Sequence, residues 1–138
     1  AMLGSTEVDG KKINDLLKEG RISKEKLDQI IDRTKKGGAE IVKFLEKGSA
    51  FYAPAASGVE MAECYLKNLK KQLPCAVYLN GEYGAKDIYA GVPVIIGSGG
   101  VEKIIELQLS EEEKANFENS VKAVNELFSA AKKIDPSL

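Results

Sequence analysis

The 138-residue sequence contains no histidine and no tryptophan, and it has only two cysteines and two arginines. Without histidine, and with Cys64 and Cys75 eleven positions apart, neither a zinc site nor a Cys-His nucleophile can be assembled from the chain. Arg21 and Arg33 stand twelve residues apart, which provides no obvious bidentate clamp for a carboxylate or a phosphate. Taken alone, the sequence has no convincing active site.

Long apolar runs and an excess of positive charge are also absent. No run of about 18 apolar residues could span a membrane, and the N-terminus has no basic segment followed by an apolar one. The formal net charge of -1 argues against a nucleic-acid binder, because neutralising phosphates requires a surplus of clustered Lys and Arg. We therefore expect a cytoplasmic protein that binds neither membrane nor nucleic acid, with its cysteines buried as free thiols.

The composition that remains is that of an ordinary globular domain, with 43% hydrophobic and 30% charged residues. A chain of this length fits one domain and should bury about two thirds of the surface that its unfolded form exposes. We assign the domain to residues 5–138. Residues 1–4, in which Ala1 precedes a Met, are expected to be a tag remnant or the cut end of a longer chain.

Helical periodicity predicts one long amphipathic helix from about Lys24 to Glu46, with Ser23 as its N-cap. Gly37-Gly38 lies inside it. Each glycine costs about 1 kcal/mol relative to alanine in a helix interior, so we expect the pair to permit close packing against a neighbouring backbone. A second helix is expected from Ala53 to about Lys71, with Pro54 tolerated in its first turn.

After Pro74 the hydrophobic period changes from 3.6 to 2, which predicts strands. The expected strands are residues 75–79, 88–96 and 101–109. Pro93 within the middle strand indicates an edge position or a bulge there. Ser110 and Glu113 form a capping box that opens a final helix. The fold class is α+β, with long helices packed on a three-stranded or slightly larger antiparallel sheet.

Three groups of residues invite a chemical interpretation. The run 97–100 (Gly-Ser-Gly-Gly) could be a nucleotide loop, but a dinucleotide fingerprint needs a third glycine where Glu102 stands, so a hairpin turn is favoured. Ser49 and Ser57 lack a histidine base and are better explained as helix caps. A polar loop could serve in acid-base chemistry, although a hydrogen-bonded turn and a partner-facing surface are favoured. It comprises Asn80, Glu82, Tyr83, Lys86 and Asp87.

Four segments together resemble the C-terminal half of malate dehydrogenases of the lactate-dehydrogenase-like type. They are residues 33–42 (RTKKGGAEIV), 48–57 (GSAFYAPAAS), 78–84 (YLNGEYG), and 92–97 (VPVIIG) followed by 100–107 (GVEKIIEL). Four motifs in the right order are far more specific than any single signature. The resemblance runs from about Ser5 to the end of the chain.

The resemblance implies a lactate/malate dehydrogenase C-terminal-domain-like fold, in which this chain is the substrate domain and an N-terminal Rossmann domain binds NAD. The parent reaction converts malate and NAD to oxaloacetate and NADH. Hydride passes between the nicotinamide and C2 of the substrate while a histidine exchanges the proton. That histidine, the aspartate paired with it and the substrate-binding arginines have no counterpart here. We therefore expect the isolated chain to be inactive and to hold no tightly bound NAD.

Carried over residue by residue, the resemblance implies that Ala50 lines the substrate pocket with Ser49 as its neighbour, and that Pro54 packs near the nicotinamide ring. It also implies a small dicarboxylate substrate and a homo-oligomer, since family members are dimers or tetramers. Two alternatives stay open. The chain could be the substrate domain of a lactate dehydrogenase, or a non-catalytic module that self-associates through residues 50–56 and 78–89.

Overall fold

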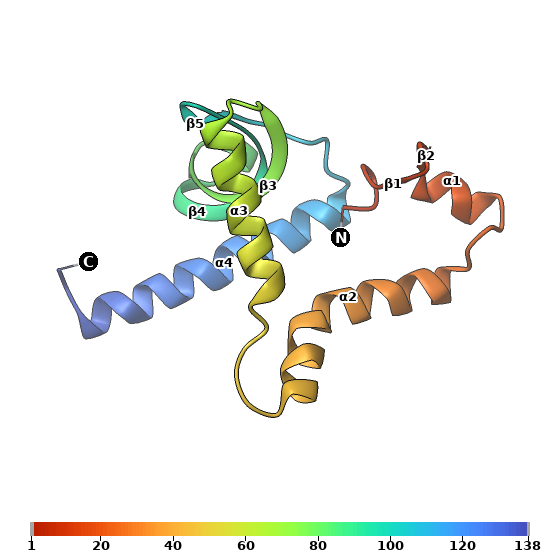
Figure 1. Ribbon diagram of the computed structural model, residues 1–138, viewed down its shortest axis with the longest axis horizontal. Coiled ribbons are helices and arrows are strands. Elements are labelled where there is room, and N and C mark those ends of the chain that lie inside the picture. Colours follow the sequence, from red (N-terminus) through yellow and green to blue (C-terminus); the bar gives the residue numbers. More distant parts are fainter. Residues whose placement is uncertain (1, 138) are drawn as a thin grey trace. The chain divides into compact units, whose positions relative to one another are not determined.

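The computed structural model describes residues 2–137 (Figure 1). The first residue of the predicted remnant and the last residue of the predicted domain lie outside this range, and the division at residue 5 stays a prediction. The chain forms two compact units, one ending at Val59 and one beginning at Glu60. Among the described residues, no helix is long and apolar enough to cross a membrane.

The N-terminal unit begins with a two-stranded hairpin of β1 (Glu7–Val8) and β2 (Lys11–Lys12). Asp9 and Gly10 form the turn, and both have positive φ (51° and 75°). Two successive residues with positive φ are what a two-residue hairpin loop requires, because that conformation matches the twist of the flanking strands. The short helix α1 (Ile13–Lys18) follows directly.

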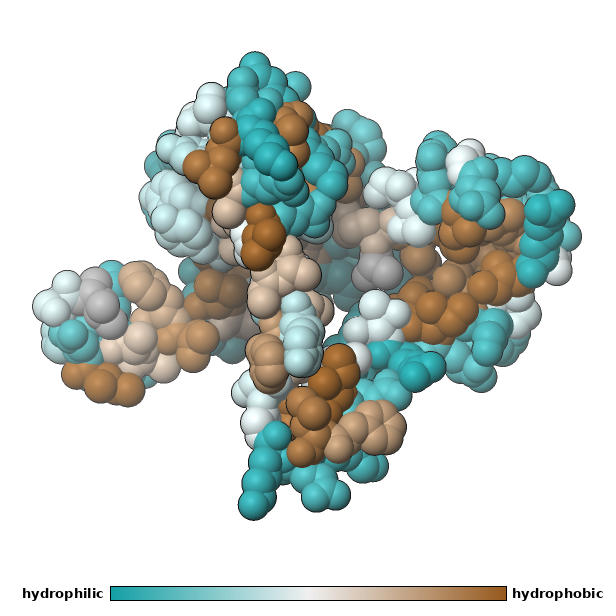
Figure 2. All heavy atoms as spheres, viewed as in Figure 1, coloured by the Kyte–Doolittle hydropathy of each residue, from teal (hydrophilic) through white to brown (hydrophobic). Residues whose placement is uncertain are grey.

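Helix α2 (Lys24–Leu45) confirms the long helix predicted for this region. The Ser23 side chain accepts a hydrogen bond of 3.2 Å from the backbone N–H of Lys26, so Ser23 is the N-cap, as predicted. Leu27 is buried, whereas Phe44 near the end of the helix is 77% exposed. Figure 2 shows hydrophobic atoms gathered on the surface over this C-terminal part of α2.

Among residues 2–137 the close packing predicted for Gly37-Gly38 is not found, because a Cβ built on either glycine would meet none of their atoms within 4 Å. Helix α2 instead changes direction along its length (Figure 1). A groove of about 570 Å³ follows the stretch from Ile30 to Phe44, and residues of α2 alone line it. A straight helix has no concave side, so a groove lined by a single helix is consistent with a bend in that helix. We attribute the bend to the glycine pair in the middle of this stretch, since glycine permits backbone distortion at low cost.

Helix α3 (Tyr52–Leu66) begins one residue before the predicted start and ends five residues before the predicted end at Lys71. Asn68 and Lys70 both have positive φ (51° and 50°), which no continuing helix allows. The chain therefore leaves the helix early, and Pro74 lies inside the next strand rather than ending the helix.

The C-terminal unit contains the predicted three-stranded antiparallel sheet. Its strands are β3 (Lys71–Asn80), β4 (Lys86–Gly97) and β5 (Gly100–Ile104), in the order β3-β4-β5. Residues 98 and 99 form the turn between β4 and β5, so the glycine-rich run is the hairpin turn that the sequence favoured. The 3₁₀ turn η1 (Glu82–Gly84) joins β3 to β4.

Pro93 lies in the central strand β4, so the predicted edge position is wrong, and the nearest bulge falls between Ile95 and Ile96. Its carbonyl accepts a 2.8 Å hydrogen bond from Ile105. In an antiparallel ladder the N–H and C=O of one residue point to the same side, so the Pro93 nitrogen faces the end of β5. Its partner on β3 is Pro74, and a non-hydrogen-bonded pair needs no N–H from either residue.

This geometry also explains why β5 is shorter than the predicted strand 101–109. Pro93 has no N–H that could donate a second hydrogen bond to the carbonyl of Ile105, so the ladder stops at Ile104. The core of the unit lies mainly on β3 and β4, together with Cys64 of α3. Cys64 and Cys75 are buried and free, as predicted. Helix α4 (Glu111–Ile134) begins with the predicted capping box and packs Phe117 and Val121 against this core.

Candidate functional site

The three residues that the resemblance assigns to a substrate and nicotinamide pocket fall within six positions of one another. Ser49 is exposed and Ala50 half-buried in the segment between α2 and α3, and Pro54 is exposed in the first turn of α3. The preceding rings of Phe51 and Tyr52 stack at a centroid distance of 4.6 Å. None of the three residues lines a groove described here, so their roles stay predictions.

Of the two arginines in the sequence, Arg33 is already paired with a carboxylate. Its Nε and a terminal guanidinium nitrogen donate hydrogen bonds of 3.1 Å and 3.0 Å to the two carboxylate oxygens of Glu40. This bidentate pair spans seven positions along the bent part of α2. Arg21 lies 3.3 Å from the carboxylate of Glu19. Both guanidinium groups therefore have carboxylate partners within the N-terminal unit.

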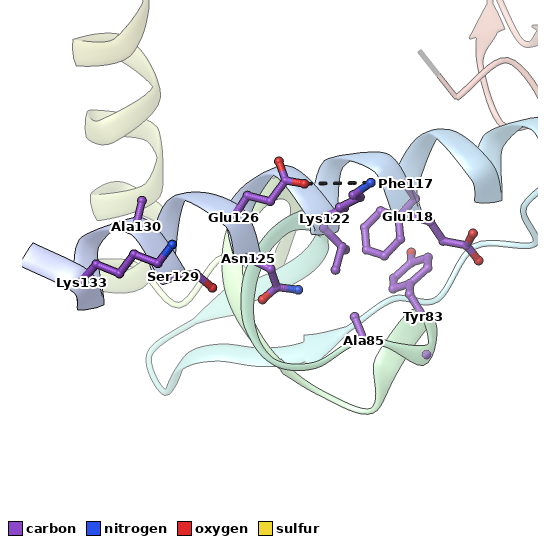
Figure 3. Close-up of a pocket in the computed structure, with 12 residues that line it drawn as sticks. Tyr83, Ala85, Phe117, Glu118, Lys122, Asn125, Glu126, Ser129, Ala130 and Lys133 are labelled. Atoms are coloured by element: carbon purple, nitrogen blue, oxygen red, sulfur yellow. Dashed lines mark ion pairs between the residues drawn. The ribbon is translucent and has the colours of Figure 1, made fainter. Parts of the chain in front are cut away.

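A groove of about 580 Å³ runs along α4 beside η1 in the C-terminal unit (Figure 3). The rings of Tyr83 and Phe117 lie together at one end of the groove, with centroids 5.2 Å apart. Lys122 and Glu126 stand on its rim as an ion pair at 3.9 Å. Charges of both signs and aromatic rings are suited to contact with another surface. The Ser129 hydroxyl also lines the groove, but the chain has no histidine that could activate it.

The sequence indicated Tyr83 as part of the polar loop, but it did not indicate that this residue contacts Phe117 on the last helix. The loop is a hydrogen-bonded turn, as favoured, because the backbone N–H of Asn80 donates to the carboxylate of Glu82 at 2.7 Å. Which residue of α4 contacts Tyr83 depends on how the helix crosses the sheet, and no local sequence pattern indicates that crossing. The predicted strand 101–109, which includes Ile105 and Leu107, was the sequence signal that the chain after β5 packs against its unit.

The shifted ionisable groups keep their usual protonation states. The hydrogen bond from Arg33 lowers the pKa of the Glu40 carboxyl, and the hydrogen bond to Asp87 raises the pKa of the Tyr78 hydroxyl. Burial raises the pKa of the Cys75 thiol. Each shift moves the pKa of the group further from neutral pH, whereas a general acid or base needs a pKa near the working pH. None of these groups is therefore suited to proton transfer.

The described residues form no metal site, and their glycine-rich turn is not built to hold a phosphate. Among residues 2–137, no group of three or more Cys, Asp and Glu side chains could hold a metal ion. In the glycine-rich turn, the N–H of Ser98 donates to the side-chain oxygen of Asn68 at 3.0 Å, and the Glu102 carboxylate lies beside Gly99. These oxygens occupy the position that a phosphate would need, so the turn is not a phosphate cradle.

Comparisons with known proteins agree on one family. A family model for the alpha/beta C-terminal domain of lactate/malate dehydrogenase matches residues 1–134. The chain is 65% identical to a malate dehydrogenase of Pelagibacter ubique over 96% of its own length and 42% of that protein. It is 53% identical to a malate dehydrogenase of Caulobacter vibrioides, over 99% of the chain and 43% of that protein.

A solved structure supports the same assignment. Lactate dehydrogenase from Eimeria maxima, crystallised with NADH and oxamate, superimposes with a TM-score of 0.93 at 40% identity, over 98% of this chain and 42% of that one. The chain thus spans well under half the length of the relatives that it matches. The four sequence motifs, the three-stranded sheet with its capped final helix and these matches together show that the chain belongs to the lactate/malate dehydrogenase family, as its alpha/beta C-terminal domain.

Proposed function

We propose that this chain is the substrate domain of an NAD-dependent malate dehydrogenase, which converts malate and NAD to oxaloacetate and NADH. The observation that carries the proposal is 65% identity, over 96% of the chain, to a protein named malate dehydrogenase. Among solved structures, a malate dehydrogenase of Cryptosporidium parvum is 42% identical and the Eimeria lactate dehydrogenase 40% identical. The choice of malate over lactate therefore rests on the two sequence relatives named malate dehydrogenase.

The proposal assigns the chemistry to a Rossmann domain that binds NAD and supplies the catalytic histidine and the substrate arginines. Two observations support this division. The chain has no histidine, and Arg33 and Arg21 both face carboxylates of their own unit. We therefore expect the 138-residue chain alone to be inactive and to bind NAD weakly at most.

In this proposal Ser49 and Ala50 form one wall of the substrate pocket, and Pro54 lies on the nicotinamide side. The half-buried Ala50 methyl supplies space and no charge, so it cannot itself choose between a dicarboxylate and a monocarboxylate. The residues that make this choice belong to the Rossmann side. We place the enzyme in the cytoplasm as a homo-oligomer.

The test measures NADH oxidation with oxaloacetate, first for the 138-residue chain and then for the chain mixed with, or fused to, the Rossmann domain of the Pelagibacter relative. We expect no turnover by the chain alone and oxaloacetate-dependent turnover by the combination, with a lower kcat/KM for pyruvate. Saturable turnover by the chain alone would contradict the inactive half of the proposal. A combination that prefers pyruvate would establish a lactate dehydrogenase instead.

A second candidate is a self-associating, non-catalytic module, and one observation favours it. Large apolar side chains are exposed in both units, including Phe44 at 77%, Tyr52 at 82% and Leu66 at 79%. Exposed apolar surface on this scale favours association. Light scattering together with binding of a hydrophobic dye separates the cases. A strictly monomeric chain that binds no dye would contradict the module.

A further inference from the structure

A small pocket of about 240 Å³ lies in the C-terminal unit where the adjoining ends of β3 and β4 meet α4. Tyr78 and Tyr89 line it from the sheet and Phe128 from the helix. Two aliphatic side chains and Asn125 complete the lining, and Asp87 is the one charged residue among them. None of these residues is Ser49, Ala50 or Pro54, to which the malate dehydrogenase proposal assigns the substrate and nicotinamide pocket, so the two proposals are tested separately.

The two tyrosines are held by the sheet itself. Tyr78 and Tyr89 are direct partners in the β3-β4 register. Their rings meet edge to face, with centroids 5.5 Å apart and planes inclined by 64°. Aromatic rings carry negative charge on their faces, and an edge-to-face pair leaves the face of one ring free for another group. The exposed fractions of 45% and 64% show that a ligand can reach both rings.

A β-bulge brings the carboxylate to the rings. The register passes from Leu79 opposite Ile88 to Asn80 opposite Lys86, so Asp87 is the extra residue and has no partner in the ladder. Its φ of 56° lies in the left-handed region, which aspartate tolerates better than most residues. A bulge redirects the side chain that it contains. Here it directs Asp87 toward Tyr78, whose hydroxyl donates a 2.6 Å hydrogen bond to Oδ1.

From this geometry we propose that the pocket binds a small organic ammonium ion, with a methylated ammonium favoured over a bare one. Aromatic faces attract cations, and Asp87 supplies the opposite charge. A bare ammonium has three N–H groups that each require an acceptor, whereas most of the lining is ring and aliphatic carbon. A methylated ammonium presents its charge through apolar surface, which suits walls of rings and aliphatic carbons.

A lysine of the chain already places a cation over one ring of the lining. Nζ of Lys132 lies 4.7 Å from the centroid of the Phe128 ring, one helical turn away on α4. The hydrogen bond to Asp87 also raises the pKa of the Tyr78 hydroxyl. The phenol therefore stays protonated and keeps its bond to the carboxylate, so Asp87 stays oriented toward the rings at neutral pH.

The test is an NMR titration of the 138-residue chain with choline, followed through its amide resonances. The control ligand is 3,3-dimethylbutan-1-ol, which has the shape of choline but no charge. We expect choline to shift the resonances of Tyr78, Asp87 and Tyr89, and the neutral isostere to bind about fivefold more weakly. Equal affinity for both ligands, or choline shifts spread away from the pocket, would overturn the proposal.

Two variants test separately what the charge of Asp87 and what the aromatic rings contribute to choline binding. Asp87→Asn preserves the shape of the carboxylate and removes its charge, and Tyr89→Leu removes one ring at an exposed position. Each should weaken choline binding about fivefold. Tyr65→Leu, at a 51% exposed position on α3, is the matched control and should bind choline like the unmodified chain.

If Asp87→Asn does not fold, as judged by the loss of amide dispersion, Tyr89→Leu alone decides the case. Unchanged choline affinity in a folded Tyr89→Leu variant would overturn the proposal. The pocket could instead be filled by a second copy of the chain. Concentration-dependent shifts of the same three resonances without ligand would establish that occupant and exclude the ammonium site.

Discussion

The Tyr83 hydroxyl donates a 2.6 Å hydrogen bond to the carbonyl oxygen of Ile105, which lies 22 positions later in the chain. The Tyr83 hydroxyl oxygen in turn accepts a 3.0 Å hydrogen bond from the backbone N–H of Leu107. One side chain thus satisfies two backbone groups in the segment where β5 has ended and α4 has not begun. Its ring also contacts Phe117, so Tyr83 connects the turn η1, this segment and the last helix.

Tyr83→Phe should lower the free energy of unfolding by about 1–3 kcal/mol, because it leaves the Ile105 carbonyl and the Leu107 N–H without their partner. The ring and its contact with Phe117 remain. Urea unfolding followed by far-UV circular dichroism measures the change. Tyr65→Phe is the matched control, since Tyr65 is 51% exposed on α3, and it should change the free energy by less than about 0.5 kcal/mol.

Leu79→Ala should be among the most destabilising single substitutions in the C-terminal unit. Leu79 is fully buried in β3 opposite Ile88, so the shortened side chain leaves a cavity. Replacements of this kind cost about 2–5 kcal/mol. Leu66→Ala removes the same atoms at a 79% exposed position of α3 and should cost much less. Equal urea midpoints for the two variants would contradict the described core.

The capping box at the start of α4 is a third test. The Ser110 side chain accepts from the N–H of Glu113 at 3.3 Å, and the Glu113 carboxylate accepts from the N–H of Ser110 at 2.9 Å. Ser110→Ala removes the first bond and should cost about 1 kcal/mol. Ser120→Ala, in the interior of the same helix, should be neutral or slightly stabilising because alanine has the higher helix propensity.

The Arg33–Glu40 pair predicts a pH dependence of the N-terminal unit. Arg33 lowers the pKa of Glu40 from its ordinary value of 4.5, so the folded chain holds this carboxyl's proton less tightly than the unfolded chain. The contribution to stability is therefore present above about pH 4.5 and is lost as the pH falls through the lowered pKa. Carbon-13 NMR titration of Glu40 should show the lowered pKa, and Arg33→Gln should return it toward 4.5. An unchanged titration in that variant would contradict the pair.

Much of this fold was predictable because the relevant signals are local. Ser23 and Ser110 mark their helix starts through bonds to residues three positions away. Strand alternation indicated the three-stranded sheet, and a glycine-rich run without the dinucleotide pattern indicated a hairpin. The family motifs were also readable in sequence, and the match over residues 1–134 confirms the family that they indicated.

The features that were missed all depend on residues far apart in the sequence. Pro74 and Pro93 are tolerated within strands because they face each other in a non-hydrogen-bonded pair, and no local pattern states that pairing. Asp87 points to Tyr78 only because a bulge in the β3-β4 ladder redirects it. The partner of Arg33 depends on α2 remaining helical through its bend.

The sequence by itself determined the helix caps, the strand alternation, the family and the absence of a histidine, since each follows from residue identity or from spacing within one element. Only the tertiary structure decided where α3 ends, how two prolines fit a sheet, and which polar groups meet. Backbone pairing and side-chain contact are set by the packing of whole elements, because a small change in register or crossing moves every side chain to a different neighbour. That is why the aromatic and acidic lining of the pocket beside α4 became visible only in the folded chain.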